Sequence, residues 1–187
     1  MFTPQIVDLA AVDAGFRAIS EQARNLVSTL GVERVTERPA PNRWSVAECL
    51  AHLNINSEAY LPVWREALRE ARDHGLTGTG PFKLDLWGRV WVWVLEPPPK
   101  FRFPAPRAFQ PVVVPSGEEV LPAFLNCQEQ VLRCIARSEG IAIDRIKIRS
   151  PFDRRVRYSV WSSFRANLAH HRRHLWQAGR VVEDLLR

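Results

Sequence analysis

The sequence of 187 residues is poor in cysteine and lacks the short motifs that mark the commonest enzyme classes. It has three cysteines, an odd number, and no C-x-x-C pair, which argues against a disulfide framework and against a cysteine zinc site. It also has no G-x-S-x-G, no glycine-rich phosphate loop and no H-E-x-x-H. Serine hydrolases, nucleotide-binding proteins and zincins therefore find no support in the sequence.

Long hydrophobic runs and targeting signals are lacking too. The longest uninterrupted apolar run in the aromatic segment, Val90–Leu95, has six residues, far fewer than a membrane-spanning helix needs. Residues 1–5 have neither the basic nor the apolar region of a secretory signal. We therefore expect no membrane span and a cytoplasmic location, where cysteines stay reduced.

The composition is that of a folded protein with a basic C-terminal part. Hydrophobic residues make up 46% of the chain, enough for one core, so we expect a single domain over residues 1–187. Residues 141–187 hold eleven Lys and Arg against four Asp and Glu, whereas the whole chain has a net charge of +6. This segment could attract an anionic substrate or nucleic acid, or could be a solvated helix face with an arginine-rich loop. Since it contains no recognised reading motif, we expect no specific nucleic-acid binding.

Apolar residues spaced three and four apart predict four helices. The helix starts carry capping residues, including two S-x-x-E capping boxes. The predicted helices run from Pro4, capped by Thr3, to about Leu30, from Ser45 to about Arg72, from Ser116 to Gly140, and from about Ser159 to Leu186. We therefore expect an all-α four-helix bundle with one long connection.

That connection, about residues 76–115, is a proline- and tryptophan-rich insert between the second and third predicted helices. Its segment Val90–Val94 suits either a strand or a short helix, and we favour the short helix. Long ordered insertions are often lids or partner surfaces. This one could be an aromatic flap over the core or a contact with a substrate or a membrane.

Histidines provide the strongest functional signal. Three of the five lie within five positions of the last predicted helix: His170, His171 and His174. Residues four apart share a helix face, so His170 and His174 can hold one divalent ion. His52 is the candidate third ligand, because His74 lies in a polar segment typical of a helix end. His171 and His174, three apart, could also bind a metal, and spacing alone does not decide between the two pairs.

Two motifs resemble those of a known family. Arg43-Trp44-Ser45-x-x-Glu48-x-x-x-His52-Leu53 and His170-x-x-Arg173-His174-x-x-Gln177, on two of four predicted helices, are similar to motifs of the DinB-like superfamily. These damage-inducible-type metalloenzymes are unrelated to the DNA polymerase that shares the name. The resemblance covers essentially the whole chain, including the proline-rich insert. It implies a bundle whose metal is held by His52, His170 and His174, with His171 left to packing or to support of the ligands.

The resemblance also implies a metal-dependent thiol-S-transferase or hydrolase. Three neutral histidines leave a divalent ion with an open position, where a bound water or thiol loses its proton readily. Zinc, nickel and iron all suit such a site. Further candidates for supporting the ligands or binding substrate are Glu48, Asn56 and Gln177.

A small molecule, such as a low-molecular-weight thiol, is the expected substrate, and a homodimer is left open. The alternative is a non-catalytic binding module that uses the basic C-terminal segment or the tryptophan-rich insert.

Overall fold

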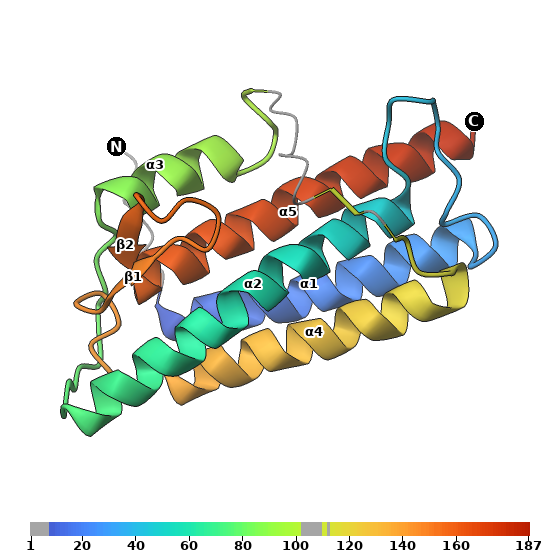
Figure 1. Ribbon diagram of the computed structural model, residues 1–187. Coiled ribbons are helices and arrows are strands. Elements are labelled where there is room, and N and C mark those ends of the chain that lie inside the picture. Colours follow the sequence, from blue (N-terminus) through green and yellow to red (C-terminus); the bar gives the residue numbers. More distant parts are fainter. Residues whose placement is uncertain (1–7, 102–109, 112) are drawn as a thin grey trace.

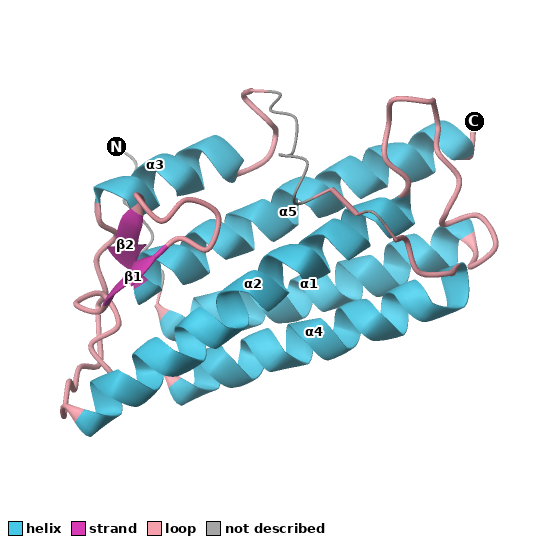
Figure 2. Cartoon of the chain, in the orientation of Figure 1, coloured by secondary structure: helices cyan, strands magenta, loops and turns pink. Residues whose placement is uncertain are grey.

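The structure, a computed structural model, describes residues 8–101, 110–111 and 113–187. These residues form five helices and one small hairpin (Figures 1 and 2). The elements are α1 (Leu9–Leu30), α2 (Val46–Asp73), α3 (Leu86–Leu95), α4 (Gly117–Arg137), β1 (Lys147–Arg149), β2 (Arg157–Ser159) and α5 (Val160–Leu185). The all-α prediction is confirmed.

Four long helices, α1, α2, α4 and α5, make up the bundle (Figure 1). α2 packs against α4 and α5, and α1 packs against the same two helices on the other side. α2 and α4 run in the same direction (Figure 1). The insert between them carries the chain back along the bundle. The core between the four helices is filled by buried apolar side chains, of which the largest are Trp64, Trp161, Phe16, Phe124 and Phe164.

Capping residues determine where these helices begin. Ser45 caps α2 through a full capping box with Glu48, and the Glu119 carboxylate accepts from both the backbone N–H and the hydroxyl of Ser116 before α4. Ser159 caps α5 by accepting from the Ser162 N–H at 3.1 Å. The starts predicted for these three helices are confirmed.

The start predicted for the first helix is wrong. α1 begins at Leu9, because Asp8 is extended and its carboxylate accepts from the Ala11 N–H at 2.8 Å. An N-cap residue has a non-helical backbone, so α1 does not include Asp8. Thr3 and Pro4 lie outside the described residues.

The insert contains the short helix that was favoured over a strand, α3, which lies on α5 and beside β2. Asp85 anchors it: one carboxylate oxygen caps Gly88 at 2.9 Å, and the other accepts from Lys147 at 2.7 Å and from the Ser159 N–H at 2.6 Å. Gly88 allows the close approach, since a Cβ there would come within 2.4 Å of the Ser162 Cβ. Part of the proline-rich insert, including Pro104 and Pro106, lies outside the described residues.

The segment expected to be an arginine-rich loop before the last helix is a hairpin instead. β1 and β2 pair antiparallel, with Ile148 opposite Tyr158 and Arg149 opposite Arg157. Ile148 and Tyr158 are buried, and the hydroxyl of Tyr158 contacts that of Tyr60 on α2. Three of the six strand residues, Ile148, Tyr158 and Ser159, are buried and hold the hairpin against the bundle.

Candidate metal centre

His52, His170 and His174 meet between α2 and α5. Each offers a ring nitrogen, and these nitrogens lie within 4.8 Å of one another. The ring centroids are 4.5 Å apart for His52 and His174, 4.6 Å for His170 and His174, and 5.1 Å for His52 and His170. Helical spacing aligns the pair on α5, and the antiparallel packing of α2 brings His52 to face them.

The spacing of these nitrogens suits a metal ion. Nε2 of His52 and Nε2 of His170 are 3.3 Å apart. Two nitrogens about 2.0–2.1 Å from a tetrahedral zinc ion are separated by about 3.3–3.4 Å. Nδ1 of His170 is buried and has no hydrogen-bond partner among the described residues. Three imidazole nitrogens within 4.8 Å of one another fit a borderline divalent cation.

The electrostatics keep the imidazoles of His170 and His174 neutral. Burial lowers the pKa of His170 well below its ordinary value, and the neighbouring His174 and His52 lower it further. Burial likewise lowers the pKa of His174, aided by the charge of Arg173 and opposed by a hydrogen bond with Gln177. A neutral imidazole has a free lone pair for a metal, so both shifts favour ligation at neutral pH.

His171 faces the core instead. Its Nδ1 lies 2.9 Å from the Asn167 carbonyl oxygen, which requires a donor at Nδ1. Its Nε2 lies 3.1 Å from Gln128 Nε2 and 3.3 Å from Ser57 Oγ, both of which can donate to it. Burial lowers the pKa of His171 to about 4. With both nitrogens engaged, His171 joins α5 to α2 and α4, and the three-histidine group contains His170 rather than His171.

The other candidates from the sequence are distributed differently. Glu48 is buried in the capping box and pairs with Arg38, and Cys49 is a core residue whose pKa is raised by burial. The three-histidine group includes neither of them. Asn56 is one turn beyond His52 and is buried, and its Oδ1 has no partner among the described residues. Gln177 is close enough to His174 to hydrogen-bond with it.

Two features of the site had no clear signal in the sequence. The Trp44 ring lies against the histidines, with its centroid 5.0 Å from that of His52 and 5.8 Å from that of His174. Trp44 stands directly before the N-cap Ser45, a position that suits an apolar contact with the first turn of α2 and contains no information about a histidine further along. Trp44 forms an apolar wall beside the ligand cluster.

The second unexpected feature is the contact between the insert and the turn of α5 that carries the histidines. Arg172 pairs with Glu96 at 2.9 Å. Arg173 donates to the carbonyl oxygens of Val94, at 3.2 Å, and Phe101. These contacts place the C-terminal end of α3 and the residues after it beside the candidate metal centre.

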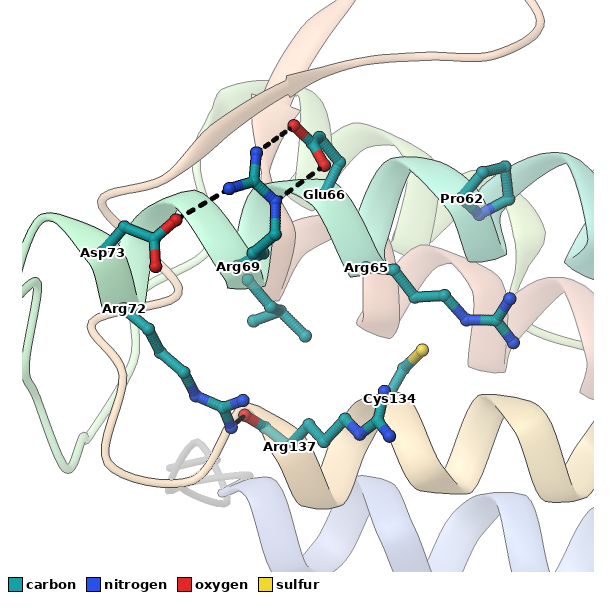
Figure 3. Close-up of a pocket in the computed structure, with 9 residues that line it drawn as sticks. Pro62, Arg65, Glu66, Arg69, Arg72, Asp73, Cys134 and Arg137 are labelled. Carbon is teal, nitrogen blue, oxygen red and sulfur yellow. Dashed lines mark hydrogen bonds and ion pairs between the residues drawn. The ribbon is translucent and has the colours of Figure 1, made fainter.

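A separate surface cleft of about 400 Å³ lies between α2 and α4, lined by Arg65, Arg69, Arg72, Arg137 and Cys134 among others (Figure 3). Its charges are largely satisfied within the protein. Arg69 bonds to Glu66 and Asp73, and Arg72 donates to the Arg137 carbonyl (Figure 3). Arg65 donates to Gln130. None of the three clustered histidines lines it. The cleft is therefore distinct from the candidate centre.

Comparison with known proteins bears on this geometry. A family model described as the DinB superfamily matches residues 16–178, which include both helices of the histidine cluster. The chain belongs to the DinB superfamily. This superfamily is a metal-binding family, as the three-histidine cluster leads one to expect. Comparison with curated proteins finds no match, and comparison with solved structures finds none either.

Proposed function

We propose that this DinB superfamily protein is a metal-dependent enzyme that acts on a small molecule, with one divalent ion held by His52, His170 and His174. The observation that supports this most is the meeting of three imidazoles from helices far apart in the sequence, with Nε2 of His52 and Nε2 of His170, 118 residues apart, lying 3.3 Å from one another. Structural zinc sites usually have four protein ligands, whereas catalytic sites usually have three and keep a position for water or substrate.

The ion would provide a Lewis acid that lowers the pKa of a bound water or thiol. The protein's own residues prepare the surroundings for that chemistry. Trp44 excludes water from one side of the cluster, and Arg173 adds a positive charge that favours an anionic substrate group such as a thiolate. Asn56, with its unpartnered buried oxygen, can orient a substrate hydrogen-bond donor. This surrounding suits both a thiol-S-transferase and a hydrolase, with zinc, nickel or iron as the ion.

Metal content is the first test. We expect purified protein, or protein reconstituted and then desalted, to retain about one divalent ion per chain by elemental analysis. His52→Ala, His170→Ala and His174→Ala should each reduce retention at least tenfold, because two remaining imidazoles chelate weakly. His74→Ala is the matched control, since His74 caps the far end of α2. Full retention in His170→Ala together with loss in His171→Ala would contradict the assignment.

The coordination sphere then separates an enzyme from a metal staple. We expect X-ray absorption of the loaded protein to show three nitrogen ligands and at least one oxygen from solvent. The same sample should be assayed for consumption of a thiol with an electrophilic acceptor, and for ester and amide hydrolysis. A shell closed by a fourth protein ligand, with no turnover in either assay, would contradict catalysis and leave only a structural ion.

A further inference from the structure

Helix α3 presents apolar side chains where a surface helix normally presents polar ones. Its inner side is formed by Gly88 and its outermost ridge by Leu86, Val90 and Trp93, spaced four and three apart. These three are 73%, 39% and 55% exposed. Trp87 and Trp91 are exposed on the adjacent flank. We call these five residues the α3 patch. Contiguous exposed apolar surface of this kind marks an interaction site.

The hairpin beside α3 is strongly basic. Residues 143–158 contain six Lys and Arg, all exposed, and two Asp. Asp153 is paired with Arg155, and Lys147 with Asp85 at the start of α3. Among the described residues, the remaining four, Arg145, Arg149, Arg154 and Arg157, have no carboxylate partner within 4 Å. A surplus of unpaired guanidinium groups therefore borders the α3 patch.

The arrangement of two of these arginines costs stability. Arg149 and Arg157 are directly opposite one another in the hairpin, and like charges at such positions repel. Arg149 also donates to the Arg154 carbonyl at 3.3 Å, which draws it toward a third arginine. Because residues two apart on a strand share a face, Arg149 points to the same side as Lys147, which reaches α3. An anionic partner at this face would relieve the repulsion.

We propose that α3 and the β1–β2 hairpin together form a docking surface for an anionic lipid membrane. Interfacial helices lie in the plane of the membrane with apolar and tryptophan side chains among the acyl chains and basic groups at the lipid phosphates. The α3 patch provides the first part and Arg149, Arg154 and Arg157 the second. The Lys100 ammonium, 4.8 Å from the Trp93 ring centroid and 2.8 Å from the Trp93 carbonyl oxygen, adds a positive charge at the patch itself. Membrane binding of an interfacial helix strengthens with its buried apolar area and with its attraction to anionic lipids, and here the two features adjoin.

Two other partners fit less well. A second copy of the chain docking through α3 would bring its own unpaired arginines against the first set, so charge opposes that pairing. Single-stranded nucleic acid binds through stacking on flat aromatic faces. Two of the three outermost positions are aliphatic Leu86 and Val90, which cannot stack on bases but can enter acyl chains. The positive charge of the hairpin and the aliphatic side chains of Leu86 and Val90 together favour a lipid partner.

Vesicle binding tests the proposal on the full chain. Sedimentation and tryptophan emission would be measured with phosphatidylcholine vesicles and with vesicles containing one-third phosphatidylglycerol. We expect at least tenfold tighter partitioning to the anionic vesicles, weakened by salt, with a blue shift of the emission. Since each basic residue near an anionic surface contributes about a fivefold factor, Arg149→Gln/Arg157→Gln should bind those vesicles roughly 25-fold more weakly.

Two further double variants separate the contribution of the α3 patch from that of the overall positive charge. Leu86→Gln/Trp93→Gln should lose the blue shift and most of the binding, while its circular dichroism stays unchanged because both side chains are exposed. Arg24→Gln/Arg133→Gln removes the same charge from exposed positions on α1 and α4 and should bind like the parent protein.

Equal weakening by the two arginine pairs would mean only non-specific attraction and would overturn the proposal. So would absence of vesicle binding, self-association abolished by the α3 variant, or an oligonucleotide bound in preference to lipid.

Discussion

At the residue scale, the neighbouring histidines His170 and His171 on α5 make different contacts. Nε2 of His170 faces His52, and its Nδ1 has no partner among the described residues, whereas His171 is fully buried and bonded on both nitrogens. We expect His171→Ala to destabilise the metal-free protein by about 2–4 kcal/mol, because it leaves a cavity and an unpaired Gln128. Chemical denaturation measures this. His170→Ala is the matched control and should change the metal-free stability much less. An equal loss of unfolding free energy in both variants would contradict the structural role assigned to His171.

Glu48 makes stability depend on pH. Burial alone raises its pKa, but the Arg38 guanidinium and the Ser45 N–H together lower it below the ordinary value of 4.5. The folded state therefore favours the ionised form, and this contribution is full above pH 4.5 and is lost as the pH falls through the folded pKa.

We thus expect Glu48→Gln to lower the unfolding free energy at pH 7 by about 1 kcal/mol, a value kept small because Arg38 is half exposed. The difference in unfolding free energy between the parent protein and Glu48→Gln should be smaller at pH 3 than at pH 7. Denaturation at both pH values measures it, with the exposed Glu66→Gln as control, which should change stability less. A gap that widens on acidification would contradict the assigned sign.

At the element scale, the docking of α3 depends on a glycine. A Cβ at Gly88 would come within 2.4 Å of the Ser162 Cβ, so Gly88→Ala should displace α3 and cost roughly 1–3 kcal/mol. Limited proteolysis of the insert and the melting temperature measure this. At Gly179, within α5, the nearest atom to an added Cβ is 3.9 Å away. Gly179→Ala should therefore stabilise the helix by about 0.5–1 kcal/mol. Insert protection unchanged in Gly88→Ala would contradict the docking.

The elements also show what a sequence can and cannot reveal. The bundle helices were predictable because caps such as Ser45 and Ser159 and a long apolar stripe act locally. The hairpin was not, since three-residue strands are too short for a period-two pattern and depend on Tyr158 packing against distant Tyr60.

For the histidine cluster, helix spacing was enough to predict that His170 and His174 share a face. The bonds of His171 to Ser57 and Gln128 were not predictable, because they depend on how α2, α4 and α5 pack together. The contact of Trp44 with His52 depends on how the chain enters α2, which residue patterns do not specify.

At the scale of the whole molecule, an ion at the candidate centre would cross-link α2 and α5. A ligand that binds only the folded state stabilises it by about 4 kcal/mol at a thousandfold excess over its Kd, or roughly 10 °C in melting temperature for a chain of this size. We expect chelator to lower the melting temperature by that order and added metal to restore it. In His52→Ala, melting should respond to neither; a full response there would place the stabilising ion elsewhere.

The position of the histidines along the chain has a consequence for synthesis. His52 belongs to an early helix, whereas His170 and His174 belong to the last one, and the nearest pair across the two helices is separated by 118 residues. During translation the growing polypeptide therefore carries one histidine of the cluster long before it carries the others. Any ion that needs all three is acquired by a chain already grown past residue 174.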